Sequence, residues 1–301
     1  MPVSVSAVVV AHDPGRAGML REAVASAGAS GADEIVVVRP YGGVIEGWEG
    51  RYRDLRSTDP TLAGKQADGV DAATGEVVAF LDDDDLWKPD KVGVLRDRFA
   101  ARPDLILLNH AYDRIDEAGR PLGPGTPADG RWTLSSNLAV RRSWAVERTD
   151  VLRAAGWEAD ETWSLVADVD RPNGVEVLAR SLTLWRYHAA NVSRSHRTTA
   201  QEFRTAHARL YPRWVRAEGV MLRYARDHGL PETSPIVARR RRRLAEFTFL
   251  AALENDSDAR AAARTLLRTP DVDRGVRQLA RLSSLSPALA RYALFRFNRF
   301  H

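Results

Sequence analysis

The residues best suited to chemistry are four consecutive aspartates, Asp82, Asp83, Asp84 and Asp85, which follow the apolar run 77–81. An uninterrupted apolar run of this length predicts a strand covered on both faces, and in open α/β sheets ligands bind beyond the carboxyl ends of such strands. Adjacent carboxylates repel one another, so a positive charge must lie close to them. Mg²⁺ or Mn²⁺ would satisfy this need, because both take oxygen ligands from one or two carboxylates and from substrate phosphate.

A second interpretation is that the four aspartates form a solvated loop in which one side chain caps the next helix. Most acidic runs do lie at the surface of proteins. Most of them, however, do not directly follow five apolar residues and precede a helix start such as Pro89-Asp90, where proline suits the first turn. The metal-binding interpretation is therefore favoured.

The composition is that of a globular protein. The chain has 301 residues, of which 44% are hydrophobic, enough for one large α/β domain and an appendage. It contains no cysteine, which excludes a disulfide framework and a thiolate metal site. The amino terminus lacks the features of a signal peptide, and no apolar run approaches the roughly 18 residues of a membrane span. We therefore expect a cytoplasmic protein.

Charge is divided unevenly along the chain. From residue 198 to the end there are 20 Arg against 10 Asp and Glu, while the preceding residues contain 24 basic and 30 acidic side chains. A basic tail of this kind suits nucleic acid, an anionic membrane surface or an anionic substrate. Because no RNA- or DNA-binding motif accompanies it, a nucleic-acid partner is not expected.

Strands alternate with helices in the first third of the chain. The apolar and turn patterns predict strands at 3–11, 33–38, 51–55 and 77–81, and helices at 17–27 and 65–73. This alternation predicts an α/β fold with a doubly wound, mostly parallel, Rossmann-like sheet.

Two segments then resemble a known family. Residues 73–92, ATGEVVAFLDDDDLWKPDKV, resemble the nucleotide-diphosphosugar-binding signature of the family-two glycosyltransferases of the GT-A fold, in which a strand ends in a DxD-type motif before a Trp and a Pro-Asp-Lys helix start. Residues 181–193, SLTLWRYHAANVS, resemble the late strand and loop of that family. The resemblance covers about residues 3–195. It implies transfer of a sugar, hexosyltransferase-type and inverting, from a nucleoside-diphosphate donor to a hydroxyl acceptor, with Mg²⁺ or Mn²⁺ bound.

The resemblance also implies roles for single residues. Asp84 would bind the metal directly, and Asp82 or Asp83 would hold the ribose or a metal-bound water. His188 lies where the family has a further metal or diphosphate ligand, and Arg186 could pair with a phosphate. An Arg-x-His sequence on a strand is more often structural, and that alternative stays open. A bound cation would stabilise the charge that develops on the leaving diphosphate.

The end of the first strand resembles the nucleotide pocket of the family. Ala11 and His12 match donor-binding positions, and His12 stands where relatives stack an aromatic ring on the base. Asp13 follows as a further donor contact, or simply as the residue that closes the turn before Pro14.

Two donor positions depart from the family pattern. Arg39 follows the second strand, where relatives place a carboxylate that reads uracil. A uridine donor is therefore not expected to be preferred over thymidine or guanosine. Lys65 is the nearest substitute for a phosphate-binding arginine in the helix before the central strand.

The general base is a further departure. The family sequence Glu-Asp-Trp, whose aspartate deprotonates the acceptor, corresponds here to Glu161, Thr162 and Trp163. A threonine hydroxyl cannot act as a base near neutral pH, because it holds its proton too tightly. We predict Asp160 or Glu161 as the base and keep Asp168 as an alternative. Both favoured carboxylates could instead be solvated residues at a helix start.

The chain is expected to comprise a nucleotide-sugar-binding half at 1–104, an acceptor-binding half at 105–197 and a basic helical appendage at 198–301. The acceptor half should contain a strand at 104–109, a hairpin at 115–121 and a Gly- and Pro-rich loop at 123–130. In the appendage, helices are predicted at 201–210, 213–228, 235–254, 258–267, 271–282 and 287–300.

The surface of the appendage leaves its partners open. The arginines at 239–243 form either a solvated helix face or a peripheral contact with anionic lipid or a polyanionic acceptor. The last helix is apolar nearly all round, so it could pack on the body of the protein, on a second subunit or on a membrane.

Three classes of function remain. The first is a glycosyltransferase that acts on a cell-envelope glycan, a lipid-linked sugar or a secondary metabolite. The second is a nucleotidyltransferase, for which the sequence AHDPGRAG at 11–18 is a faint match. The third is a non-catalytic sugar-nucleotide-binding protein. It is consistent with Arg39, Gln66 and Thr162, which stand where relatives carry a uracil-reading carboxylate, an arginine and the general base.

Overall fold

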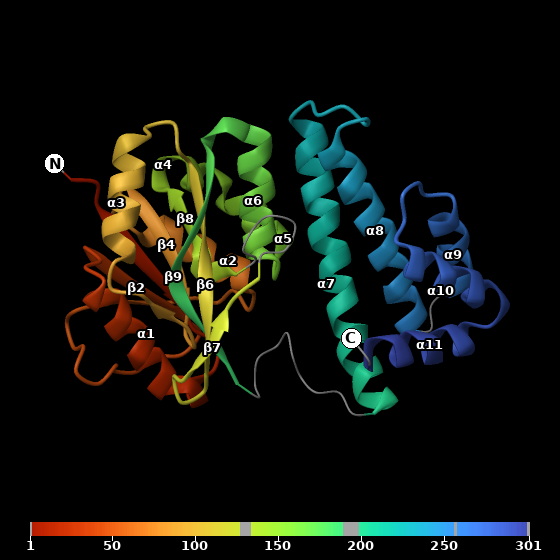
Figure 1. Ribbon diagram of the computed structural model, residues 1–301, viewed down its shortest axis with the longest axis horizontal. Helices are drawn as coiled ribbons and strands as arrows, with labels where there is room; N and C mark the ends of the chain where they lie inside the picture. Colours follow the sequence, from red (N-terminus) through yellow and green to blue (C-terminus); the bar gives the residue numbers. More distant parts are fainter. Residues whose placement is uncertain (1, 127–133, 189–198, 256–257, 300–301) are drawn as a thin grey trace. The chain divides into compact units, whose positions relative to one another are not determined.

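The fold was analysed in a computed structural model, which describes residues 2–126, 134–188, 199–255 and 258–299. The chain divides into two compact units, Met1–Asn191 and Val192–His301 (Figure 1). In the described part of the chain, no helix is both long enough and apolar enough to cross a membrane.

The first half of the amino-terminal unit is a parallel sheet. β1 pairs in parallel with β2 on one side and with β4 on the other, and β3 extends the sheet beyond β2. Residues of β1, β2 and β4 are almost all buried, as expected for strands covered on both faces. The bounds are β1 Val5–Val10, β2 Glu34–Arg39, β3 Arg53–Arg56 and β4 Val77–Asp82.

The second half of the sheet is mixed, unlike the mostly parallel sheet that the sequence predicted. β8 enters antiparallel between β4 and β6, whereas β6 and β9 run parallel. In the described residues the order is β3-β2-β1-β4-β8-β6-β9-β5, and β7 pairs with β6. The bounds are β5 Leu86–Trp87, β6 Leu107–Asp116, β7 Pro121–Pro124, β8 Leu138–Arg141 and β9 Val175–Tyr187.

The predicted hairpin at 115–121 joins β6 to β7. Its turn depends on Gly119, which has a φ of 82° and donates its N–H to the carbonyl of Asp116 at 2.9 Å. The predicted loop at 123–130 is only partly a loop, because Gly123 and Pro124 belong to β7. Residues 127–130 lie outside the described residues.

Helices cover both faces of the sheet. α1 and α3 pack on one face, where Leu20 and Leu95 join a core that includes Val9 and Leu81. On the other face, Trp163 of α6 stacks on Phe80 with ring centroids 5.9 Å apart. The bounds are α1 Ala17–Ala29, α2 Leu62–Ala72, α3 Lys91–Ala101, α4 Arg142–Ala145, α5 Thr149–Ala155 and α6 Ala159–Asp170.

A glycine sets the closeness of α2 to the sheet. A Cβ on Gly69 would lie 2.3 Å from Cγ1 of Val8, a distance that the buried strand could not relieve. The approach brings Lys65, one turn earlier on α2, to the carboxyl end of β1.

The carboxy-terminal unit is helical and has its own core, which includes Phe249, Leu253 and Leu266. α7 and α8 pack together, and α9 to α11 follow (Figure 1). The bounds are α7 Ala200–Asp227, α8 Pro235–Glu254, α9 Ala259–Leu267, α10 Arg274–Leu285 and α11 Pro287–Arg299.

The two helices predicted at 201–210 and 213–228 are one helix, and the predicted break was wrong. Pro212 lies inside α7 and has no N–H to donate to the carbonyl four residues earlier, that of Ala208. The side-chain amide of Asn255 donates to this carbonyl at 3.3 Å. A residue that is distant in sequence therefore offsets the loss of the helical hydrogen bond.

The arginine run 239–243 is not a single solvated face. Arg240 is buried, and its Nη1 lies 3.2 Å from a carboxylate oxygen of Glu218, which is 1% exposed. Arg243 contacts the same carboxylate, and Arg241 pairs with Glu232 at 3.3 Å. The run thus joins α8 to α7 and to the loop between them.

Candidate active site

The carboxyl end of β4 places the four aspartates at one edge of the sheet, as the sequence predicted. Asp85 points inward and is held there, because Ser136 Oγ donates to its Oδ2 at 2.6 Å and the N–H of Arg186 donates to its Oδ1 at 2.9 Å. The backbone N–H of Asp82 donates to the same Ser136 hydroxyl at 3.0 Å. Ser136 therefore fixes the start and the end of the acidic run.

Asp84 lies close to two basic side chains. Its Oδ2 lies 2.8 Å from Nη1 of Arg16 and 3.0 Å from Nε2 of His188. The same guanidinium nitrogen lies 3.4 Å from Oδ1 of Asp83. The positive charge that four aspartates require is thus supplied in part by the chain itself.

Arg16 was missed by sequence reasoning, because its closeness to the aspartates follows from the order of the strands. It ends the short 3₁₀ segment Pro14–Arg16 directly after β1, and β1 and β4 are adjacent parallel strands whose carboxyl ends meet at one edge. A basic residue in the turn after β1 therefore had to lie near the acidic residues after β4.

Burial governs the protonation of these aspartates. Burial, with the nearby charge of Asp84, raises the pKa of Asp83 to about 7 and that of Asp85 to about 8. For Asp83, these effects outweigh the lowering by Arg16. Burial and the carboxylates of Asp85, Asp84, Asp83 and Asp160 together raise the pKa of Asp82 well above its usual value. A further cation at this edge would favour the ionised forms.

His188 and Arg186 come from the end of β9 and have different surroundings. The His188 ring reaches Asp84, as described above. The guanidinium of Arg186 is buried, donates to the carbonyls of Asp84 and Glu117 at 2.9 and 2.8 Å, and pairs with Glu22. This arrangement braces the acidic loop, and a contact of Arg186 with a donor phosphate stays a prediction. Asn191 and Ser193, which belong to the family-like segment 181–193, lie outside the described residues.

A second cluster lies at the end of β1. His12 stacks on Trp157 with ring centroids 5.6 Å apart, and its Nδ1 lies 3.0 Å from Nζ of Lys65. Burial, with the positive charges of Lys65 and Arg16, lowers the pKa of His12 to about 4, so the imidazole is neutral near pH 7. Burial also lowers the pKa of Lys65.

The two clusters are joined through the backbone. The N–H of His12 donates to Oδ2 of Asp83 at 3.4 Å. Ala11, one residue earlier, is fully buried and donates its N–H to the carbonyl of Val38. Asp13 caps the following turn by accepting from the N–H of Gly15 at 2.8 Å, which agrees with its interpretation as a turn residue.

Arg39 lies at the end of β2 and is only 3% exposed. Its Nε and Nη2 lie 2.8 and 3.0 Å from the two carboxylate oxygens of Asp54, and it also donates to the carbonyl of Gly43. The guanidinium of Arg39 is therefore paired with a carboxylate of the neighbouring strand β3. Direct contact of Arg39 with a donor stays a prediction.

The beginning of α6 is where a base was predicted. Thr162 is fully buried, and its hydroxyl donates to the carbonyl of Glu158 at 2.5 Å, an interaction typical of a structural threonine. Asp160 and Glu161 both lie in the first turn of the helix and are half-buried. The charge of Asp160 contributes to the raised pKa of Asp82, so its carboxylate is directed within electrostatic range of the acidic edge.

The donor set suits a divalent cation in kind, since carboxylate oxygens and an imidazole are ligands that Mn²⁺ and Mg²⁺ accept. Among the described residues, however, no group of three His, Asp or Glu side chains has the spacing of a metal site. Arg16 contacts the same Asp84 oxygen as His188 does. The residues fit a cation only if Arg16 moves away from Asp84.

Comparison with known proteins defines the class. Residues 6–145 match the family described as glycosyl transferase family 2. A protein from Nostoc sp. (strain PCC 7120), named an uncharacterized glycosyltransferase, is 29% identical over 153 residues, which cover 44% of this chain and 47% of that protein. The chain thus spans about half the length of this curated relative.

Solved structures of TarS from S. aureus have a similar fold. TarS 1–349 in complex with UDP-GlcNAc superposes with a TM-score of 0.58 at 14% sequence identity, covering 99% of this chain and 92% of that chain. The complex with UDP gives a TM-score of 0.54 at 11% identity. The fold is therefore GT-A with a helical carboxy-terminal region. Within the amino-terminal unit, residues 6–145 are similar to glycosyl transferase family 2.

Proposed function

We propose that the protein is a glycosyltransferase that moves a sugar from a nucleoside-diphosphate donor to a hydroxyl acceptor, with inversion and with Mg²⁺ or Mn²⁺ bound at Asp84. The observation that supports this most strongly is the meeting of β4, the turn after β1 and the end of β9 at one edge, where Asp84 contacts Arg16 and His188. A diphosphate with its cation suits an edge that presents both carboxylates and positive groups.

Each group has a distinct part in this proposal. The cation, when bound, would neutralise the charge that develops on the leaving diphosphate. Asp84 and His188 would hold it, with Asp82 or Asp83 on a bound water or the ribose. Arg16, once released from Asp84, would lie beside the diphosphate, for which a guanidinium is well shaped. His12, neutral and stacked on Trp157, would border the nucleoside.

The proposed general base is Asp160. In an inverting displacement, the base must lie on the sugar face opposite the leaving diphosphate and within hydrogen-bond reach of the attacking oxygen. Asp160 is in the first turn of α6 and is near enough to raise the pKa of Asp82. Glu161 in the same helical turn is the alternative, and the effect of Asp160 on the pKa of Asp82 favours Asp160.

The nucleobase of the sugar donor is a separate question. The TarS structures contain UDP-GlcNAc and UDP, but in this chain Arg39 stands where a uracil-reading carboxylate is expected. We predict that uridine diphosphate is not clearly preferred over thymidine or guanosine diphosphate. Competition binding in Mn²⁺ tests this directly, and a strong preference for uridine would contradict it.

The experiment that tests the function is a donor screen. Full-length protein is incubated with Mn²⁺ and radiolabelled uridine, thymidine or guanosine diphosphosugars, and release of nucleoside diphosphate is measured with and without candidate acceptors such as cell-envelope glycans and lipid-linked sugars. The proposal predicts metal-dependent release from at least one donor. Metal-dependent binding without any release would favour a non-catalytic sugar-nucleotide-binding protein, and use of a nucleoside triphosphate with release of pyrophosphate would favour a nucleotidyltransferase.

The cellular location of the protein and its contacts with a membrane or a second subunit are also proposals. The basic carboxy-terminal helices favour a cytoplasmic protein that contacts a membrane surface peripherally or associates with a second subunit. Sedimentation of the protein with anionic vesicles and its mass in solution by light scattering would test the two contacts.

A further inference from the structure

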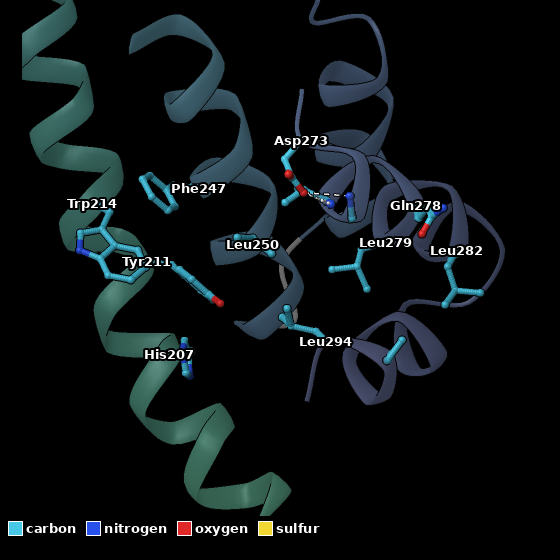
Figure 2. Close-up of a pocket in the computed structure, with 13 residues that line it drawn as sticks. His207, Tyr211, Trp214, Phe247, Leu250, Asp273, Gln278, Leu279, Leu282 and Leu294 are labelled. Carbon is cyan, nitrogen blue, oxygen red and sulfur yellow. Dashed lines mark hydrogen bonds between the residues drawn. The ribbon is translucent and has the colours of Figure 1, made fainter. Parts of the chain in front are cut away.

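A cavity of about 450 Å³ lies within the carboxy-terminal unit and is lined by residues of that unit (Figure 2). Side chains from α7, α8, α10 and α11 line it, and they are largely apolar or aromatic. They include Tyr211, Trp214, Phe247, Leu250, Leu279 and Leu294. The volume falls in the range of about 300–1,000 Å³ that is usual for small-molecule sites.

Two polar side chains in the wall are engaged by the helices themselves. Nδ1 of His207 lies 2.9 Å from the carbonyl of Phe203, and the two rings stack with centroids 3.8 Å apart. Asp273 caps α10, because its Oδ1 accepts from the N–H groups of Gly275 and Val276 (Figure 2). Apolar and aromatic side chains thus predominate in the described lining, which favours an apolar ligand.

Exposed apolar side chains continue from the same two helices. Leu285 is 79% exposed at the end of α10, three residues after the lining residue Leu282. On α11, Leu289 and Tyr292 are 51% and 59% exposed and lie three residues apart, hence on one face of the helix. Large apolar side chains gathered at a surface indicate contact with an apolar partner.

Positive charge accompanies these apolar residues. Arg274 and Arg281 are exposed on α10. Arg274 is adjacent in sequence to the lining residue Gly275, and Arg281 is adjacent to the lining residue Leu282. Arg296 is exposed on α11. All 20 basic residues from position 198 onward are arginine, and none is lysine. Arginine binds carboxylates and phosphates through two parallel hydrogen bonds.

We propose that this cavity binds one aliphatic chain of an anionic amphiphile, whose head group lies against Arg274 and Arg281. The cavity suits the chain, the exposed leucines and tyrosine suit the apolar boundary of a lipid phase, and the arginines suit a carboxylate or phosphate head. A fatty-acyl lipid and a phosphorylated isoprenoid share this chemistry. The site does not depend on the transfer reaction, and its test uses binding alone.

Trp214 reports occupancy of the cavity. It is the one tryptophan in the sequence after residue 191, and it lines the cavity. The protein is titrated with 9,10-dibromostearic acid, which is kept below its critical micelle concentration. This probe is chosen because bromine quenches tryptophan fluorescence on contact. We expect saturable quenching in the wild type and loss of that component in Trp214→Phe. Quenching that is absent, or equal in the two proteins, would overturn the proposal.

A matched pair of substitutions on α11 tests the location. Ala293 lines the cavity, whereas Ala288 is exposed on the same helix. Ala293→Phe should fill the cavity and weaken binding at least about tenfold, and Ala288→Phe should leave it unchanged. If thermal melting shows that Ala293→Phe does not fold, Val276→Phe on α10 replaces it. Equal affinity in the wild type and in the folded cavity variant would place the ligand elsewhere and refute the site.

Competitors distinguish the sources of the chain. Displacement of the brominated fatty acid by farnesyl phosphate, but not by phosphatidylglycerol vesicles, would identify a soluble phosphorylated isoprenoid as the preferred ligand class. The reverse result would identify a bilayer lipid. Both outcomes support the proposal. In either case, the effective competitor should displace the brominated fatty acid less well from the double variant Arg274→Gln, Arg281→Gln than from the wild type. Failure of both competitors, or equal displacement by uncharged farnesol, would contradict the anionic head group.

Discussion

Buried charges in the amino-terminal unit meet at the carboxyl ends of β1 and β4, whereas those in the carboxy-terminal unit lie between two packed helices. In the first, Arg16 and His188 contact Asp84, which lies at a sheet edge among aspartates of raised pKa. In the second, Arg240 and Arg243 contact Glu218, whose side chain is 2% exposed. The first arrangement leaves an excess of carboxylates, as the proposed cation site requires, while the second pairs one carboxylate with two guanidinium groups and is structural.

The largest expected effect concerns the proposed general base in the amino-terminal unit. Asp160→Asn should lower turnover by about 10² to 10⁴, because loss of a general base typically has this effect, and donor binding should be preserved. Turnover is measured by release of nucleoside diphosphate, and Glu161→Gln is the matched control from the same helical turn. If both variants turn over normally and Asp168→Asn is inactive, the base has been misplaced.

The next effect concerns stability of the carboxy-terminal unit. Glu218→Ala should destabilise it by about 3–5 kcal/mol, since removal of one partner leaves buried positive charge uncompensated. Glu232→Ala removes an exposed partner of Arg226 and Arg241 and should destabilise the unit much less, because solvent screens exposed ion pairs. Chemical denaturation monitored by circular dichroism compares the two. Equal losses would show that the Glu218 cluster is not a buried ion pair of structural importance.

A smaller effect follows from His12. Its folded-state pKa of about 4 is below the unfolded value of 6.5, so the unfolded chain binds a proton first as pH falls. Stability is therefore lost as pH falls through 6.5, by about 2 kcal/mol between pH 7.5 and pH 5. His12→Gln should lack this component, so its free energy of unfolding should fall less over the same interval. Parallel curves for wild type and variant would contradict a buried neutral imidazole.

The elements that were predicted well are those whose signals are local. The limits of two elements were predicted to within a residue: β4, Val77–Asp82, and α8, Pro235–Glu254. The signals lie within the segments themselves, because β4 is an apolar run and α8 is a helical pattern that begins at a proline and ends at a glutamate. The break at Pro212 was wrong because the group that compensates for the proline belongs to Asn255. No local pattern contains that information.

The candidate site follows the same rule. The sequence located the aspartates and the turn after β1, but it did not give their partners. Arg16 reaches Asp84 across 68 positions of sequence, and Arg39 is taken up by Asp54 of the neighbouring strand. Both contacts depend on strand adjacency, so they become visible only when the order of the sheet is known.

The central claim is that the acidic edge binds a nucleoside diphosphate together with a divalent cation. Isothermal titration calorimetry with uridine, thymidine and guanosine diphosphates, each with and without Mn²⁺, tests it most directly in the wild type, in Asp84→Asn and in Asp90→Asn, whose aspartate pairs with Arg180 on the surface. We expect metal-dependent binding in the wild type and in Asp90→Asn, and its loss in a folded Asp84→Asn. If Asp84→Asn binds the nucleotide in Mn²⁺ as tightly as the wild type does, Asp84 is not the metal ligand and the claim is contradicted.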